Sequence, residues 1–186
     1  NSRPPITSRW PTDINFHMSE NANPIATIQT TKGEMSIELW PDITPGTVAN
    51  FTKLANDGFY DGTCFHRIMA GFMIQGGDPQ TKDESLENLW GTGGPGHTIK
   101  AEFNDRPHVR GVISMARSAD PDSAGSQFFV CLGDADFLNG QYTAFGQLSD
   151  GDDALGDIGD TPVGPSGSGE NSKPKERVEV TSIRVA

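Results

Sequence analysis

Short segments in which apolar and polar residues alternate run through the chain from residue 25 onward. The first two are residues 25–31 (IATIQTT) and 34–40 (EMSIELW), and a Thr-Lys-Gly turn lies where they meet. Alternation with a period of two is typical of a strand with one buried face. Two such segments around a glycine-containing turn predict a β-hairpin.

The strand pattern returns further along the chain. Residues 65–78 (FHRIMAGFMIQGGD) read as two short strands around an Ala-Gly turn. The other strand-like segments are residues 97–103, 110–116, 126–132, 143–148 and 176–185. Between them lie a polar, glycine-rich connection over residues 77–97 and a Gly/Pro/Ser loop over residues 161–175. These patterns predict about eight strands.

Two segments have helical signals instead. Thr44 can cap a helix in which Pro45 takes the first position, and Gly58 can end it. Residues 48, 51, 54 and 55 are apolar and share one face of that helix. A second, short helix is predicted over residues 152–158. Strands still dominate, so the chain is predicted to be mainly β, a closed barrel covered by two helices, in which the last strand pairs with the first.

The length of 186 residues fits one domain. We predict that this domain spans residues 24–186 and that residues 1–23 are an N-terminal extension. The extension is polar, contains three prolines and lacks the apolar core of a secretory signal. Met18 is a possible native start, which would make the preceding residues a vector-derived remnant. A trimmed organellar or exported protein is the alternative.

Charge and composition exclude several classes of partner. The formal charge is −11 and the pI is about 4.6, so the surface repels phosphate backbones and argues against nucleic acid as a partner. No apolar segment is long enough to cross a membrane. Cys64 and Cys131 lie in strand-like segments and are predicted to be reduced core thiols. Reduced thiols and the absent signal favour a cytoplasmic location, and the lack of a spare apolar stripe favours a monomer.

Familiar motifs for cofactors and metals are incomplete. Residues 91–96 match G-x-G-x-x-G, but no strand precedes them, no helix follows, and His97 stands where a phosphate-binding loop has lysine. A tight irregular loop is the better interpretation. An EF-hand loop counted from Asp150 would have Leu155 and Thr161 at its glycine and glutamate positions. The four histidines lack metal-ligand spacing, and no serine stands in G-x-S-x-G. We therefore predict no cofactor and no metal.

Arg67 is the unusual residue in the segment 65–78. Its guanidinium is always charged and lies within an apolar pattern that contains no carboxylate near it. A half-buried arginine is destabilising unless a partner offsets the loss of hydration. One interpretation is a structural salt bridge within the barrel. The other is a hydrogen-bond donor that points at a substrate in an apolar cleft.

A second cluster of motifs favours the substrate interpretation. Residues 111–130 (GVISMARSADPDSAGSQFFV) are followed by residues 137–146 (FLNGQYTAFG). Together with FHRIMAGFMIQGGD, these segments resemble the cyclophilin family of peptidyl-prolyl cis–trans isomerases. The resemblance covers residues 24–185, nearly the whole chain. It implies an eight-stranded antiparallel barrel with two capping helices and an active site on the outer face of the barrel.

The resemblance also implies roles for single residues. By motif position, Arg67 is the catalytic arginine, Gln75 steadies it and Phe72 belongs to the catalytic set. The proline pocket is then lined by Phe72, Met73, Phe129 and Leu138. Gln127 and the backbone of Ala116, Arg117 and Ser118 are expected to hold an extended peptide.

The resemblance also assigns Phe137 and Tyr142 to substrate binding, and the chain departs from many relatives at these two positions and at Arg117. Phe137 replaces a tryptophan and Tyr142 replaces a histidine, which resembles bacterial-type members. Without the indole N–H one donor is missing, so weak binding of cyclosporin A is expected. Arg117 stands where many relatives have asparagine, and its side chain is expected to alter peptide preference.

Two functions remain open at this point. The first is an isomerase that acts on X–Pro bonds of peptides and client proteins and assists folding, with Arg67 donating a hydrogen bond to the prolyl nitrogen. The second is a non-catalytic peptide-binding or assembly module that uses the same groove. The complete set of motif residues favours the first.

Overall fold

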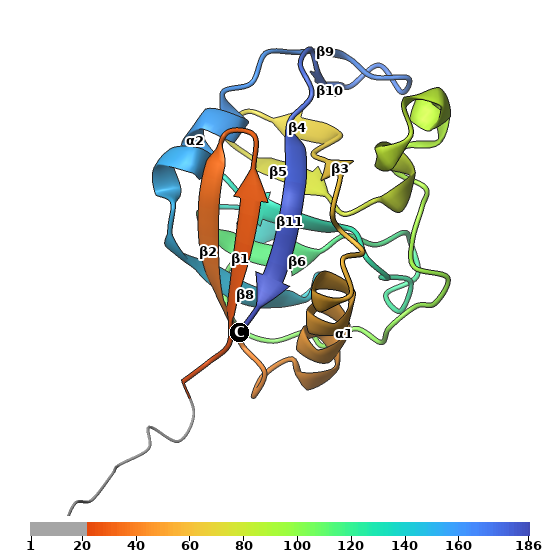
Figure 1. Cartoon of the computed structure of the whole chain (residues 1–186). Coiled ribbons are helices and arrows are strands. Elements are labelled where there is room, and N and C mark those ends of the chain that lie inside the picture. Colours follow the sequence, from red (N-terminus) through yellow and green to blue (C-terminus); the bar gives the residue numbers. More distant parts are fainter. Residues whose placement is uncertain (1–21) are drawn as a thin grey trace, which may run out of the picture.

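One antiparallel sheet of nine strands dominates the structure (Figure 1), a computed structural model that describes residues 22–186. Residues 1–21, and with them most of the predicted extension, lie outside the described residues. The strand order is β3-β11-β1-β2-β8-β6-β7-β5-β4. In chain order these strands are β1 (Ile25–Thr30), β2 (Gly33–Leu39), β3 (Thr63–Cys64), β4 (Arg67–Met69), β5 (Met73–Gly76), β6 (Val112–Met115), β7 (Phe128–Cys131), β8 (Ala144–Asp150) and β11 (Glu179–Val185).

The sheet curls so strongly that one short stretch of chain supplies both of its edges. The edge strands β3 and β4 are separated only by Phe65 and His66. The last strand, β11, pairs with the first, from Ala26 opposite Val185 to Thr30 opposite Val180. The predicted mainly β fold with two α-helices is therefore confirmed. The prediction of a closed eight-stranded barrel needs correction, because the main sheet has nine strands and is a strongly curled half-barrel with β3 and β4 as its two edges.

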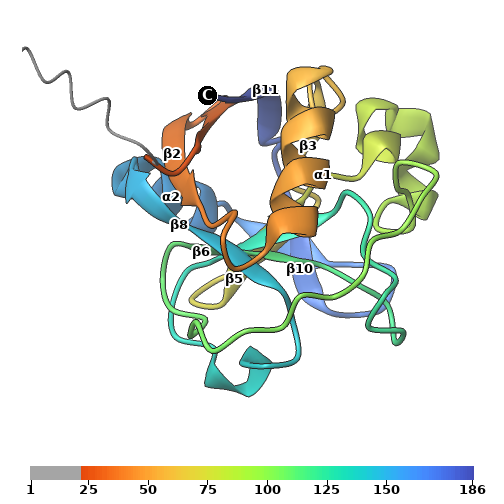
Figure 2. The same ribbon diagram turned by 90° about the horizontal axis from the view of Figure 1, so that it is seen from below.

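Two α-helices accompany the sheet (Figure 2). Helix α1 (Pro45–Asn56) packs against β11, and α2 (Asp152–Gly159) packs near β2. As predicted, α1 begins at Pro45 and buries its apolar face. Thr44 does not cap it, because its hydroxyl donates to the carbonyl of Trp40. The carboxylate of Glu102 accepts instead from the N–H groups of Gly46 and Thr47, at 3.2 and 2.6 Å.

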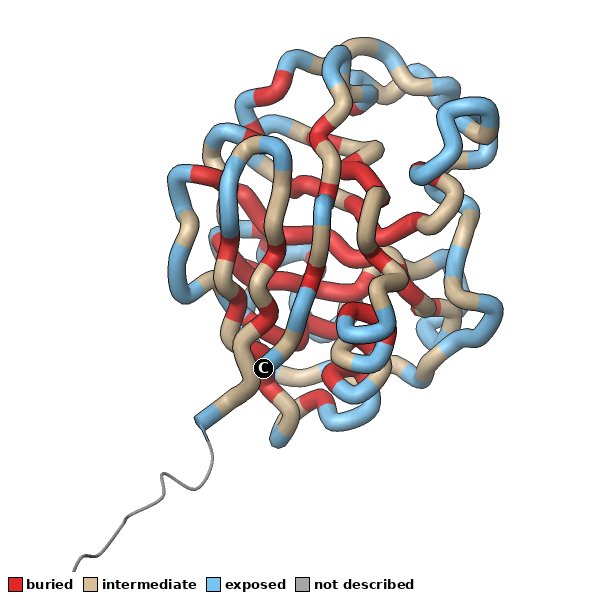
Figure 3. Tube along the Cα trace, in the orientation of Figure 1, coloured by how far each residue is buried: buried red, intermediate tan, exposed pale blue. Residues whose placement is uncertain are grey.

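The main core lies inside the curled sheet (Figure 3), where β6 and β7 are buried along their whole length and β1 and β2 bury alternate residues. Aromatic rings fill its centre. The ring of Phe51 from α1 lies 5.2 to 5.8 Å from those of Tyr60, Phe128 and Phe145. The buried hydroxyl of Tyr60 donates to the carbonyl of Ser126 at 2.9 Å, so its polar atom is satisfied. Cys64 and Cys131 are free, buried thiols.

Two predicted segments differ in the structure. Residues 97–103 do not form a strand, and only an isolated bridge joins Ile99 to Ala124. The predicted loop 161–175 contains a second, two-stranded sheet of β9 (Val163–Pro165) and β10 (Asn171–Pro174). Proline and glycine hid this hairpin from the alternation pattern.

The remaining helical turns are short. They are the 3₁₀ helices η1 (Pro79–Lys82), η2 (Glu84–Leu89) and η3 (Asp136–Leu138). The first two lie within the polar connection that follows β5. Within residues 22–186, no helix has the length and apolar character needed to cross a membrane.

Gly77, which follows β5, is predicted to tolerate no side chain. Its φ is +88°, and an added Cβ would lie 2.5 Å from the carbonyl oxygen of Ser126. Gly71 is a matched control because its φ is +74° but no atom lies within 4 Å of its added Cβ. We expect Gly77→Ala to lower the free energy of unfolding by about 3 kcal/mol and Gly71→Ala by about 1 kcal/mol. Urea denaturation measures both, and equal losses would contradict the steric account.

Candidate active site

Neighbouring strands place the motif side chains in one row. Arg67 on β4 lies directly opposite Gln75 on β5, and Gln75 lies opposite Phe129 on β7. The Nη1 of Arg67 donates to Oε1 of Gln75 at 3.0 Å, and Nε2 of Gln75 donates to Oε1 of Gln127 at 3.1 Å. Gln127 in turn donates to the carbonyl of Gly93 at 2.9 Å. The guanidinium therefore begins a continuous chain of hydrogen bonds.

Arg67 also has an ionic partner that the sequence did not predict. Glu170, which directly precedes β10 in the β9–β10 hairpin, accepts from Nε at 2.7 Å and from Nη2 at 3.0 Å. Hydrogen bonds from Arg67 and Ser172 lower the pKa of Glu170 to about 2, so the carboxylate is charged at neutral pH. Arg67 therefore does form a salt bridge, but its partner comes from the β9–β10 hairpin outside the main sheet and not from the barrel.

The ion pair does not seal Arg67 inside the protein. The side chains of Arg67 and Glu170 are 35% and 32% exposed. Both border a cavity of about 1040 Å³ between η2 and the β9–β10 hairpin, called here the hairpin cavity. The guanidinium is consequently paired and still accessible, so the two interpretations of Arg67 are compatible.

The residues expected to form a proline pocket lie together in one packed apolar cluster apart from the main core. Because the family resemblance assigns them to a proline pocket, this cluster is called here the apolar pocket. Its buried members are Met73, Phe129, Cys131, Ala135 and Leu138, and Met69, Phe72, Ala116 and Tyr142 pack against them. The exposed ring of Phe137 lies 5.5 Å from that of Phe72. The sulfur of Met69 accepts from Nη2 of Arg67 at 3.4 Å, which connects the guanidinium to this pocket.

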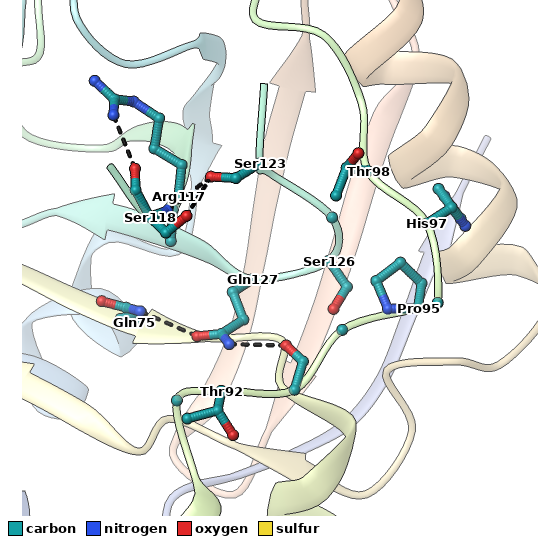
Figure 4. A pocket seen from close by; sticks show the side chains of 16 residues that line it. Gln75, Thr92, Pro95, His97, Thr98, Arg117, Ser118, Ser123, Ser126 and Gln127 are labelled. Atoms are coloured by element: carbon teal, nitrogen blue, oxygen red, sulfur yellow. Dashed lines mark hydrogen bonds between the residues drawn. The ribbon is translucent and has the colours of Figure 1, made fainter. Parts of the chain in front are cut away.

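The remaining predicted residues border a groove of about 780 Å³ (Figure 4), called here the Gly-loop groove. Gln75 and Gln127 line it together with Ala116, Arg117 and Ser118. The N–H groups of Ala116 and Ser118 already donate to Gln127 and Ser123 within the protein. In the part of the chain that the structure describes, the amide of Arg117 has no such partner.

Contacts with Gln141 and Tyr142 fix the side chain of Arg117. Its Nε and Nη2 donate to the carbonyl of Gln141 at 3.0 and 2.8 Å. Its guanidinium also lies 4.6 Å from the ring centre of Tyr142, a cation–π distance. Arg117 and Tyr142, two of the departures from the family pattern, therefore contact each other at the edge of the site.

The glycine-rich loop forms one wall of the Gly-loop groove. The buried carboxylate of Asp78 accepts from the N–H groups of Gly91 and Gly93 at 2.6 and 3.1 Å. A Cβ on Gly93 would lie 2.1 Å from this carboxylate, so glycine is required there. The prediction of an irregular loop is confirmed, since the loop folds around a carboxylate of its own chain.

Sequence reasoning missed Glu170, Met69 and the wall formed by Gly91 and Gly93. Glu170 is 103 residues from Arg67 and sits in a segment of glycine, serine and proline. The one signal available was the lack of a local partner for Arg67.

Comparison with known proteins agrees with this geometry. Residues 25–185 match the family model described as cyclophilin type peptidyl-prolyl cis-trans isomerase/CLD. Peptidyl-prolyl cis-trans isomerase from Synechococcus elongatus is 46% identical over 125 residues, which are 67% of this chain and 80% of that protein. Peptidyl-prolyl cis-trans isomerase B from Bacillus subtilis is 48% identical over 120 residues, which are 63% of this chain and 78% of that protein.

A solved structure is similar over most of the fold. The Cryptosporidium parvum cyclophilin type isomerase, crystallised in the presence of the dipeptide Ala-Pro, superposes with a TM-score of 0.76 at 32% identity. The match covers 87% of this chain and 98% of that one. The chain therefore belongs to the cyclophilin-type peptidyl-prolyl cis–trans isomerases. As a member of this family it catalyses the interconversion of cis and trans X–Pro bonds.

His66, next to Arg67, is predicted to weaken the fold in mild acid. Burial, with a smaller contribution from the nearby charge of Arg67, lowers its pKa from 6.5 to about 4. The unfolded chain therefore takes up a proton at a higher pH than the native protein does, and stability falls as the pH drops from about 6.5 to about 4. One pKa unit corresponds to about 1.4 kcal/mol, so a shift of this size predicts a loss on the order of 3 kcal/mol.

Urea denaturation of the wild type and of His66→Gln across this pH range measures the effect. Burial also lowers the pKa of His108, so both proteins lose some stability in acid. The difference between the two proteins isolates His66. Parallel curves would contradict the prediction.

Proposed function

We propose that Arg67 accelerates X–Pro rotation by donating a hydrogen bond to the prolyl nitrogen while the apolar pocket holds the proline ring. The observation that carries this proposal is the position of the guanidinium. It lies between the hairpin cavity and the apolar pocket, and Gln75 and Glu170 hold it from two sides.

The physical basis is the change in the amide nitrogen during rotation. Partial double-bond character gives the peptide bond a barrier of about 18–20 kcal/mol. When the bond is twisted, conjugation is lost and the nitrogen regains its lone pair, which can accept a hydrogen bond. The planar amide nitrogen is a poor acceptor. A donor at this place therefore stabilises the transition state more than the ground state, and such differential binding accelerates the reaction.

The two halves of the substrate have separate binding surfaces under this proposal. The proline ring enters the apolar pocket next to Met73, Phe129 and Leu138. The residues on the other side of the bond extend along the Gly-loop groove, where the free amide of Arg117 and the side chain of Gln127 can bind backbone groups. The proline side of the X–Pro bond is held in the apolar pocket, and the other side of the bond can turn. Ala-Pro, the dipeptide present with the Cryptosporidium parvum relative, has the minimal form of such a substrate.

Unfolded or partly folded client proteins are the proposed physiological substrates. X–Pro isomerisation takes tens to hundreds of seconds without a catalyst and can limit folding. The site needs only an extended peptide with one proline, so it suits many clients.

Replacing Arg67 tests the proposed mechanism. We expect Arg67→Ala to lower kcat/KM for a proline peptide by about 100-fold, because a charged donor to the transition state is lost. Arg67→Lys is expected to recover little, since lysine lacks the rigid planar fork that Gln75 and Glu170 hold. A protease-coupled assay with an Ala-Pro peptide measures these rates.

Arg106→Ala is the matched control for the loss of one surface arginine. The guanidinium of Arg106 lies over Trp40, on a different part of the protein. We expect its activity to stay within about 2-fold of the wild type. Full turnover by Arg67→Ala would refute the mechanism, and full binding of peptide without turnover by the wild type would favour a non-catalytic peptide-binding module.

Weak binding of cyclosporin A is the expected consequence of Phe137. This ring is 66% exposed at the rim of the apolar pocket and cannot donate a hydrogen bond. We expect Phe137→Trp, which adds an indole N–H, to tighten binding by about 10-fold, the effect of one net hydrogen bond. Calorimetric titration measures both proteins. Nanomolar binding by the wild type would contradict the expectation.

A further inference from the structure

We propose that Glu170 is a positioning residue of the isomerase, a carboxylate on the β9–β10 hairpin that fixes the Arg67 fork in its active orientation. The inference rests on the proposed role of Arg67. It concerns a residue in the segment that the sequence pattern assigned to a loop.

The contact has the geometry of a specific pair. Both carboxylate oxygens of Glu170 accept from different nitrogens of Arg67, Oε1 from Nε at 2.7 Å and Oε2 from Nη2 at 3.0 Å. Such a two-point contact fixes the plane of the guanidinium as well as its distance, which a single hydrogen bond cannot do. A free arginine side chain has many rotamers, so an unpaired Arg67 would sample many orientations.

Counting donors indicates that Glu170 positions Arg67 without blocking it. A guanidinium has five N–H groups. Glu170 takes two and Gln75 takes one, while a fourth points at the sulfur of Met69, a weak acceptor in the apolar pocket. The second N–H of Nη1 has no partner among residues 22–186. The N–H that points at Met69 and the unpaired N–H of Nη1 therefore remain for substrate. The first of these lies beside the pocket that is proposed to hold proline.

The hairpin that carries Glu170 is itself anchored to the domain. Strand β10 packs against β4, the strand of Arg67, and Ser172 on β10 is buried. Lys173 also forms a salt bridge with Glu87 on η2, but both side chains are exposed, so this pair adds little to the anchoring. The N–H of Ser166 donates to the carbonyl of Glu170 at 2.7 Å and closes the turn. The carboxylate therefore comes from a defined backbone position, as a positioning residue requires.

Gln75 and Glu170 divide the task between them. Gln75 holds Nη1 from the neighbouring strand, and Glu170 holds the opposite edge of the fork from outside the main sheet. The negative charge of Glu170 also offsets the loss of hydration that a guanidinium suffers beside an apolar pocket. Removing Glu170 should thus leave peptide binding nearly intact while the donor to the twisted bond becomes disordered.

Glu170→Gln is the central test, measured by kcat and KM for an Ala-Pro peptide. Glutamine keeps the size but loses the charge and one acceptor. We expect kcat to fall about 10-fold and KM to change by less than about 2-fold. Glu170→Asp keeps the charge on a shorter side chain, so its kcat should lie between those of the wild type and Glu170→Gln. Glu87→Gln is the matched control, because it breaks the other ion pair of the same hairpin, and its kcat should stay within about 2-fold.

A double-mutant cycle separates positioning from a general structural role. If Glu170 acts through Arg67, adding Glu170→Gln to Arg67→Ala should cause no further loss. The order of the fork is read independently from proton exchange at Nε of Arg67 by nuclear magnetic resonance. Glu170→Gln should accelerate this exchange without disturbing the backbone amide spectrum.

Each contrary result has a separate meaning. An unchanged or increased kcat in Glu170→Gln, or unchanged exchange at Nε of Arg67, overturns the positioning role. The positioning role is also overturned if Glu170→Gln lowers kcat as much in the Arg67→Ala background as in the wild type. A fall in kcat of Glu87→Gln equal to that of Glu170→Gln overturns it as well. If Arg67→Ala loses activity while Glu170→Gln does not, this inference alone fails. If Arg67→Ala keeps full activity, the proposed mechanism fails first.

Discussion

A charged guanidinium beside an apolar pocket must be held by partners, and the site is organised around this requirement. Arg67 cannot lose its charge, so the protein surrounds it with acceptors that leave part of its fork free. Gln75 and Glu170 meet it from two directions. The chain of hydrogen bonds continues through Gln127 to the carbonyl of Gly93, so the guanidinium and the wall of the Gly-loop groove form one connected network.

The curled sheet makes this network possible because it sets the register of three adjacent strands. Arg67, Gln75 and Phe129 lie opposite one another on β4, β5 and β7. A slip of one residue would turn each of these side chains to the other face. The Gly76-Gly77 pair ends β5 where backbone segments approach too closely for a side chain on Gly77. The short segment 75–77 therefore contains both Gln75, which holds Arg67, and Gly77, which the close backbone approach requires.

Much of this arrangement could be predicted from the sequence, and the failures share a cause. Alternation located the hairpin β1–β2, β6, β7, β8 and β11, and the motif located Arg67 with its neighbours. Residues 97–103 alternate but do not form a strand, because their amides bond to side chains instead, that of Ala101 to Asp122 and that of Glu102 to Thr143. Glu102 likewise caps α1, and Glu170 pairs with Arg67. These contacts join residues far apart in the chain, and no local pattern records them.

A crystal structure of the protein with a bound proline-containing peptide tests the central claim most directly. The account predicts that the proline ring contacts Met73, Phe129 and Leu138. It also predicts that an N–H of Arg67 points at the prolyl nitrogen of the X–Pro bond, within a hydrogen-bond distance of about 3 Å. Glu170 should still pair with the other edge of the fork. A peptide whose proline lies outside this pocket, or a guanidinium turned away from it, would contradict the account.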